Sequence, residues 1–361
     1  DHLGGCEIDK KISEVYKKNH NPKFFFNEDI KVFLNREDYP EELNNLDILD
    51  GSPPCSSFSV AGDREKYWGK EKKFREGQAF QVLDDLFFTF IKLAKKLRPK
   101  VVIAENVKGL RSMLKGKVED KIKADIRKLG YVVNVTVLNS ADYYVPQKRE
   151  RLILVGIRKD IQLTYEYPKP FKKIYVLKDA LKKGELFDSN VPKSNGAKYP
   201  LSKKSILDMV PPKGYWRDLP LEIQKEFMGA SFYLGGGKTG IARRIGWDEP
   251  CLTLTCSPAQ KQTERCHPEE TRPFTVREYA RIQTFPDKWS FEGSIAQQYK
   301  QIGNAVPPQF SYVLAEIIYK INNILRQKIK FNRLVAKKKQ ITQFITIQNN
   351  NSYINKFFYN N

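Results

Sequence analysis

Short runs of β-branched and other apolar residues alternate with helical patterns in the first half of the chain. The runs are LDILD, VVIAEN, VVNVTVL and LILVGI, which begin at Leu46, Val101, Val132 and Leu152. Such alternation is typical of a mostly parallel sheet covered by helices. The pattern therefore predicts an α/β fold between residues 46 and 157.

Apolar residues recur every three or four positions in the segments between these runs, which predicts helices. One such segment extends from Val82 to Leu97 and stops before Pro99. Another extends from Val118 to Leu129, and Gly130 is suited to end it. Both helices are expected to cover the sheet.

Two further helices are predicted in the last third of the chain. Thr275 and Glu278 have the capping-box spacing of a helix start. Pro307 and Pro308 precede a second apolar pattern, which extends to Leu325. Regular structure therefore returns after an irregular middle.

That irregular middle, about residues 169–267, is rich in proline, glycine and short uneven runs. It predicts a second, smaller domain inserted into the first. The expected organisation has an α/β part at 1–168, an inserted domain at 169–270, a return to the first part at 271–330, and a basic, poorly ordered tail at 331–361.

Charge narrows the possible partners. The chain of 361 residues has 63 Lys and Arg against 42 Asp and Glu, so its net charge is +21. The last 36 residues hold eight of the basic residues and no acid, so the remainder is basic in its own right. A polyanion is the natural partner of such a chain.

Cysteine usage and hydropathy suggest a compartment. Five scattered cysteines do not form the dense pattern of a secreted disulfide scaffold, so we expect them to be reduced and the protein to be cytoplasmic. The sequence contains no apolar run of the ~20 residues that a membrane helix needs and no signal-peptide pattern, so no membrane is expected.

Candidate chemistry lies at the ends of the predicted strands, where ligands bind in open α/β sheets. Cys55 follows the first strand in GSPPCSSFS, and Glu105 ends the second. A cysteine is a strong nucleophile only as a thiolate, which an electropositive site favours. Arg149 and Arg151 of QKRER could supply that field. Taken singly, a loop cysteine is usually incidental and a strand-end glutamate is usually a solvated cap.

Five sequence segments, taken together and in order, favour a catalytic role for these residues over the ordinary one. GSPPCSSFS, ENVKGL, QKRERLILVGIR, RPFTVREYARIQTFP and QIGNAVPP together closely resemble the bacterial cytosine 5-methyltransferases that act on DNA in type II restriction–modification systems. The resemblance covers the chain from Cys6 to about Arg326. It implies a Rossmann-like, mostly parallel methyltransferase sheet at 1–168 and 271–330, and a target-recognition domain at 169–270.

The resemblance also implies catalytic roles. Cys55 matches the nucleophile that adds to carbon 6 of cytosine, and Glu105 matches the group that holds or protonates ring nitrogen 3. Arg149 and Arg151 match arginines that orient the base and assist the thiol. The base must be flipped out of the duplex, and Ser59 to Gln78 matches a mobile loop that closes over it.

The implied cofactor is S-adenosyl-L-methionine. Seven residues match its binding positions: Glu7 for the ribose hydroxyls, Ile8 under the adenine, Asp29 and Ile30 at the adenine edge, Leu86 through its backbone, and Asn304 and Val306 in the last cofactor segment.

One departure from the family pattern concerns the glycine-rich turn F-x-G-x-G-G, which should precede the acid by ~20 residues. Gly4 and Gly5 lie only two residues before Glu7, and the chain begins without methionine. The sequence therefore looks truncated before its first strand. We expect this chain alone to bind the cofactor weakly or not at all.

The segment LGGGKTG, Leu234 to Gly240, resembles a phosphate-binding loop, but Phe232 stands where the first glycine is required. By resemblance it belongs to the target-recognition domain. We therefore predict that Lys238, Arg243 and Arg244 contact DNA.

Three cysteines and a histidine could be counted as metal ligands. Their spacing matches no common zinc pattern, so no metal is expected. The residues are Cys251, Cys256, Cys266 and His267.

The leading hypothesis is a monomeric enzyme that methylates cytosine in a short site of double-stranded DNA and protects it from a cognate restriction endonuclease. A second is a truncated, non-catalytic DNA-binding remnant, which the coding sequence upstream would distinguish. A third is an RNA cytosine methyltransferase, which methyl transfer to tRNA would distinguish.

Overall fold

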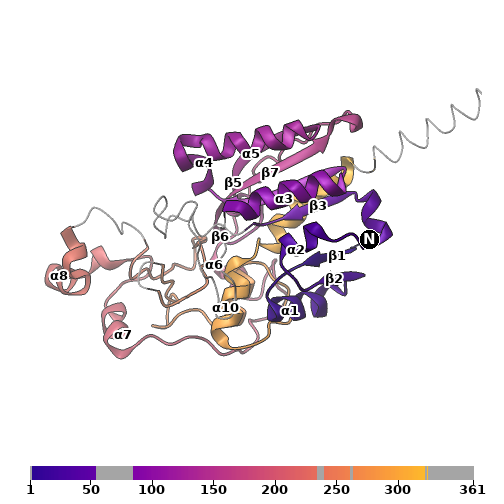
Figure 1. The fold of residues 1–361 in the computed structure, drawn as a ribbon. Coiled ribbons are helices and arrows are strands. Elements are labelled where there is room, and N and C mark those ends of the chain that lie inside the picture. Colours follow the sequence, from indigo (N-terminus) through magenta and orange to yellow (C-terminus); the bar gives the residue numbers. More distant parts are fainter. Residues whose placement is uncertain (1, 54–83, 234–239, 261–262, 322, 324–361) are drawn as a thin grey trace, which may run out of the picture. The chain divides into compact units, whose positions relative to one another are not determined.

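The structure is a computed structural model that describes residues 2–53, 84–233, 240–260, 263–321 and 323. The chain divides into two compact units, Asp1–Val313 and Leu314–Asn361. The elements named below belong to the first unit (Figure 1). In the second unit, residues 314–321 are helical.

A four-stranded sheet forms the centre of the first half. Its strands are β3 (Ile48–Gly51), β4 (Val101–Val107), β5 (Tyr131–Asn139) and β7 (Glu150–Arg158), in the order β3-β4-β7-β5. β3 is parallel to β4, whereas β7 is antiparallel to both β4 and β5. Three strands therefore share one direction and β7 is reversed. The four predicted runs are confirmed as strands.

The predicted helices cover this sheet. α3 (Asp84–Leu97) and α5 (Lys117–Lys128) pack with the short α4 (Gly109–Ser112) and the sheet strands in one hydrophobic core, and Figure 1 shows α5 lying along β5 and β7. Gly130 has a φ of +88°, a left-handed conformation that suits glycine, so α5 ends where the sequence predicts.

A small two-stranded sheet lies before the central one in the chain. β1 (Gly4–Cys6) and β2 (Phe24–Phe26) are parallel, and α1 (Lys10–His20) connects them. α2 (Ile30–Asn35) follows β2 and packs against α3 through a cluster that includes Phe33, Leu93 and Leu97. Because β1 and β2 are parallel, the residues after both strands meet at one edge.

The remaining elements of the first unit pack around two further cores. They are β6 (Gln147–Lys148), α6 (Leu177–Leu181), α7 (Leu201–Asp208), α8 (Leu221–Met228), β8 (Cys251–Leu252), α9 (Val276–Ile282) and α10 (Ile295–Asn304). One core joins α6, α9 and α10, and the other lies among residues 199–266. The capping box at Thr275 and Glu278 is confirmed at the start of α9, and a helix begins at 308.

The chain returns along the central sheet after β7. Asn134 Nδ2 donates to Tyr165 O at 2.5 Å, and the Tyr167 hydroxyl donates to Asn134 O and Ile153 O, each at 2.8 Å. Phe171 N then donates to the carbonyl of Asp142, which follows the end of β5. The residues around 162–171 therefore carry the chain from the end of β7 back to its beginning.

Candidate active site

The carboxyl ends of β3 and β4 lie side by side. Cys55 falls outside the described residues, but β3 leads towards it through Ser52 and Pro53. The buried Asn106 side chain donates to Pro53 O at 3.4 Å and accepts from Val107 N at 2.8 Å. The approach to Cys55 is thus attached to β4 one residue beyond Glu105.

Glu105 and Arg151 form an ion pair at this edge. Arg151 Nε lies 2.8 Å from Glu105 Oε1, and the two side chains are 13% and 14% exposed respectively. The reversed direction of β7 makes this possible, because its first residues lie opposite the last residues of β4, with Arg151 opposite Val107. The pair gives the Glu105 carboxylate a fixed direction in a site largely shielded from water.

Arg149 is placed differently. It is 2% exposed, and its guanidinium donates to the carbonyls of Leu254, Gly303 and Ala305 at 2.9–3.1 Å. Burial lowers its pKa to about 9, with the positive charge of Arg151 as the next cause. Arg149 therefore holds chain segments together, and the prediction that it orients the base stays a prediction.

The predicted cofactor residues at the first two strands are brought together. Glu7 N donates to Phe26 O at 3.0 Å, and Asn27 Nδ2 donates to Glu7 O at 2.7 Å. Asp29 begins α2 and accepts from Lys31 N at 2.7 Å. Burial raises the pKa of Cys6 to about 12, and the negative charges of Glu28, Glu7 and Asp29 contribute.

This edge fits a nucleoside. Carboxylates accept hydrogen bonds from hydroxyl and amino groups, and Glu7 and Asp29 supply two of them. Beside Glu7 the apolar Ile8 is 40% exposed, a surface that a flat ring could cover. Ile30 is half-buried at the start of α2.

The other predicted cofactor residues lie on helices or just after them. Leu86 is buried in the first described turn of α3. Asn304 ends α10 with an exposed side chain whose Oδ1 accepts from Cys256 Sγ at 2.8 Å, and Val306 follows it, half-buried. Val306 lies just beyond Ala305, whose carbonyl Arg149 binds.

Two of the three predicted DNA contacts, Arg243 and Arg244, lie among the described residues. Lys238 lies outside the described residues. Arg244 is buried, and its guanidinium donates to Leu207 O, Val210 O, His267 O and Thr271 Oγ1. The donors of Arg244 are used inside the protein, so a contact between Arg244 and DNA stays a prediction that requires these hydrogen bonds to break.

Arg243 is half-buried and pairs with Glu249, whose two carboxylate oxygens lie 3.0 and 2.9 Å from Nη2. Its Nη1 also donates to Lys213 O. A contact between Arg243 and DNA stays a prediction, and it requires this bidentate ion pair to open.

The cysteine and histidine group does not converge on one point. Cys251 and Cys266 are buried and Cys256 is exposed, while His267 Nδ1 accepts from Glu269 N and Glu270 N. Within the described ranges, no group of three or more His, Cys, Asp or Glu residues could hold a metal ion. Nor is any helix among the described residues long and apolar enough to cross a membrane.

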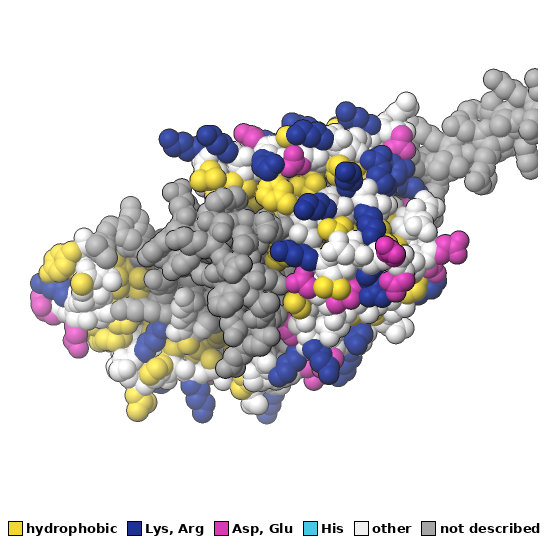
Figure 2. Space-filling model, viewed as in Figure 1, with side chains coloured by type: hydrophobic (Ala, Val, Ile, Leu, Met, Phe, Trp, Pro, Cys, Tyr) yellow, Lys and Arg dark blue, Asp and Glu magenta, His cyan; other side chains and the backbone are white. Residues whose placement is uncertain are grey.

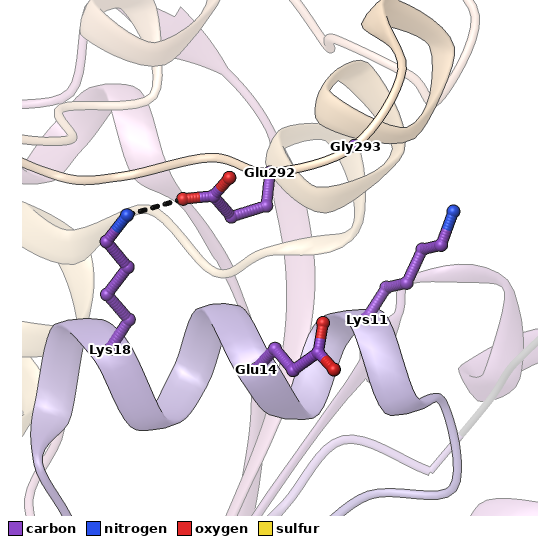
Figure 3. A pocket seen from close by; sticks show the side chains of 5 residues that line it. All are labelled: Lys11, Glu14, Lys18, Glu292 and Gly293. Carbon is purple, nitrogen blue, oxygen red and sulfur yellow. Dashed lines mark hydrogen bonds and ion pairs between the residues drawn. The ribbon is translucent and has the colours of Figure 1, made fainter.

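A pocket lies between α1 and the turn at Glu292 and Gly293 (Figure 3). Lys11, Glu14 and Lys18 of α1 line it, and Lys18 Nζ lies 2.6 Å from Glu292 Oε1. It contains none of the predicted site residues. On the face shown in Figure 2, Lys and Arg side chains are interspersed with Asp and Glu.

Two buried glutamines were missed by the sequence reasoning. Gln147 and Gln283 are each 0% exposed and bond to each other through Gln147 Nε2 and Gln283 Oε1 at 2.8 Å. Both lie inside the motifs quoted above, QKRER and RIQTFP. The available signal was a glutamine adjoining apolar neighbours, which is too common to single out.

A family model for DNA methylases and several known methyltransferases match this chain. Residues 1–320 match the family model described as C-5 cytosine-specific DNA methylase. Type II methyltransferase M.Eco47II of Escherichia coli is 52% identical over 86% of this chain and 72% of its own length. Type II methyltransferase M.Sau96I of Staphylococcus aureus is 44% identical over 88% and 71% respectively.

Solved structures show a similar fold. A DNA modification methyltransferase encoded within an E. coli prophage has a TM-score of 0.65 at 19% identity, covering 90% of this chain and 93% of its own. The S. pombe Dnmt2 methyltransferase has a TM-score of 0.54 at 17% identity, covering 90% and 92%. These similarities agree with the α/β methyltransferase fold predicted from the sequence.

Proposed function

This chain belongs to the C-5 cytosine-specific DNA methylase family and is a DNA cytosine-5-methyltransferase of the bacterial restriction–modification type, and we propose how it acts. It methylates cytosine within one short sequence of double-stranded DNA, with S-adenosyl-L-methionine as the methyl donor. Its action protects cytoplasmic host DNA from a cognate restriction endonuclease. The protein acts as a monomer.

The observation that carries the proposed chemistry is the Glu105–Arg151 ion pair beside the approach to Cys55. In this proposal Cys55 forms a bond to carbon 6 of the flipped cytosine. This addition moves electrons towards ring nitrogen 3, which Glu105 hydrogen-bonds or protonates. Carbon 5 thereby becomes nucleophilic. Arg151 keeps the Glu105 carboxyl directed at that nitrogen.

When bound, S-adenosyl-L-methionine supplies an electrophilic methyl group. Glu7, Ile8, Asp29 and Ile30 would hold its nucleoside, and Leu86, Asn304 and Val306 would contact the remainder. After carbon 5 is methylated, it loses its proton to a base, the bond between Cys55 and carbon 6 breaks, and the thiolate leaves.

Residues 169–270 act as the target-recognition domain in this proposal. The separate hydrophobic core among residues 199–266 supports the assignment, because it lets this region keep its own shape while its surface varies. Arg243 and Lys238 are the proposed DNA contacts. Residues 271–330 complete the catalytic domain, and 331–361 form a basic tail.

A duplex with 5-fluorocytosine at the target tests the covalent step, because fluorine at carbon 5 prevents the release of the thiolate. The protein should become trapped on this duplex when S-adenosyl-L-methionine is present. Cys55→Ala should abolish the adduct, whereas Cys256→Ala, which removes another exposed thiol, should retain it. An adduct that survives Cys55→Ala overturns the mechanism, and so does the absence of an adduct with a full-length protein that also carries the glycine-rich turn.

The substrate is tested in a second experiment. Bisulfite sequencing of DNA from cells that express the protein should show methylcytosine in one short sequence. In a separate methyl-transfer assay with purified protein, duplex DNA should accept a methyl group and a tRNA transcript should not. Methylation of the transcript alone would instead favour the RNA enzyme.

A further inference from the structure

Three buried polar side chains lie beneath the segment that contains Asn304. Gln147, Arg149 and Gln283 are 0%, 2% and 0% exposed, and they come from β6, from the residue between β6 and β7, and from the end of α9. Buried polar groups destabilise a protein unless their hydrogen bonds are made. The hydrogen-bond partners of these three side chains therefore show which backbone segments the cluster fixes in place.

The two glutamines form a relay with one direction. Leu254 N donates to Gln147 Oε1 at 2.9 Å, and Gln147 Nε2 donates to Gln283 Oε1 at 2.8 Å. Gln283 Nε2 donates onward to Ile302 O at 2.8 Å. A backbone N–H at one end and a backbone carbonyl at the other fix the orientation of both amides.

The same cluster binds the carbonyls on both sides of Asn304. Arg149 Nη2 donates to Gly303 O at 2.9 Å and to Ala305 O at 3.1 Å. On its other side Gly303 lies against the backbone of Thr255 and Cys256, so close that an added Cβ would come within 2.5 Å of Thr255 O. The Asn304 side chain is exposed, and among the described residues its Oδ1 accepts a hydrogen bond from the Cys256 thiol.

We propose that Gln147 and Gln283 are positioning residues for the methyl donor. Through Ile302 O they set the end of α10, and so the place from which Asn304 and Val306 contact S-adenosyl-L-methionine. This inference rests on the proposed function. In this proposal neither glutamine touches the donor or the base. Apolar side chains could fill the same space, but only hydrogen bonds can fix the orientation of residues 302–306.

Gln283→Met tests this, because it keeps the side-chain length and removes the amide's hydrogen bonds to Gln147, Ile302 and Ala305. Gln298→Met is the matched control, since Gln298 lies on α10 but its amide donates to Gly293 O, away from the segment. The dissociation constant for S-adenosyl-L-methionine, measured by calorimetry, should rise about tenfold in Gln283→Met, equivalent to about 1.4 kcal/mol. The control should change it by less than about twofold, equivalent to about 0.4 kcal/mol.

A second readout needs no cofactor. Cys256 donates its thiol hydrogen to Asn304, so the rate at which a thiol reagent alkylates Cys256 reports whether Asn304 is in place. Mass spectrometry of the Cys256 peptide should show faster alkylation in Gln283→Met and no change in Gln298→Met. Affinity for duplex DNA without cofactor should be unchanged in both variants.

Two results would overturn the proposal. One is a folded Gln283→Met protein with unaltered donor affinity and Cys256 reactivity, and the other is an equal loss of DNA affinity, which would indicate general damage. Gln147→Met repeats the test if Gln283→Met does not fold, and the double variant should lose no more than the larger single loss. If the unaltered chain binds S-adenosyl-L-methionine too weakly to measure, as its sequence predicts, donor affinity is measured on a chain that also carries the glycine-rich turn. No donor binding by that longer chain would count against the proposed function, and the Cys256 result would still report on the two glutamines.

Discussion

Gly303→Ala should destabilise the protein although it replaces a glycine near the end of a helix. Gly303 is the penultimate residue of α10. A Cβ at this position would lie 2.5 Å from Thr255 O, 2.6 Å from Thr255 C and 2.7 Å from Cys256 N. All three are backbone atoms, so no side chain can rotate away to make room.

The magnitude follows from two opposed effects. Overpacking a well-packed site costs about 1–3 kcal/mol, and rigid backbone neighbours favour the upper part of that range. Alanine is better than glycine inside a helix by about 1 kcal/mol. The free energy of unfolding should therefore fall by about 2 kcal/mol, and Asn304 should shift with its neighbour.

Urea denaturation of three alanine variants measures this. Gly130→Ala should cost about 1–2 kcal/mol, because Gly130 has a φ of +88° with open space around it. Gly184→Ala should change stability by less than about 0.5 kcal/mol, since an added Cβ would lie 4.0 Å from Lys182 O. A Gly303→Ala protein as stable as Gly184→Ala would refute the reasoning.

Three further predictions concern activity, pH and salt. Glu105→Gln should lower methyl transfer by about 10²–10⁴-fold while gel-shift affinity for duplex DNA persists, and a variant that keeps most of its rate would exclude Glu105 from proton transfer. Burial lowers the pKa of His267 from 6.5, so the folded state favours the neutral ring and stability is lost as pH falls below about 6.5. Urea midpoints at about pH 7.5 and about pH 5.5 should therefore differ less in His267→Gln than in the unaltered protein. DNA affinity should fall with salt by about −0.9 in log–log slope per phosphate contact, and a salt-independent affinity would contradict DNA binding through charge.

The sequence predicted the sheet well because its strands are apolar runs that do not depend on distant partners. Helix ends were equally local, as at Gly130 and at the Thr275–Glu278 capping box. The reversed direction of β7 was not predicted. Residues 140–149 are too few for a helical crossover between β5 and β7, so the spacing did contain that information.

The site was predicted less completely, because its geometry depends on residues far apart in the chain. Glu105 was assigned from one motif and Arg151 from another, and their ion pair required the strand register. Gln147 and Gln283 are 136 positions apart, and neither looks unusual alone. The burial of Arg244 could not be predicted either, because an arginine beside a glycine-rich segment looks exposed until its partners are known.

Residues 162–171, which return along β5 and β7, are scarcely longer than the distance that they span. β7 has 9 residues, about 30 Å at ~3.3 Å per residue, and the ten residues 162–171 span about 33 Å when fully extended. Tyr165 and Tyr167 attach this nearly extended segment to the sheet through hydrogen bonds with Asn134. Removing even two residues from it would pull the residues after Phe171 towards the sheet or break those hydrogen bonds. Changes of length should therefore be tolerated only after Phe171.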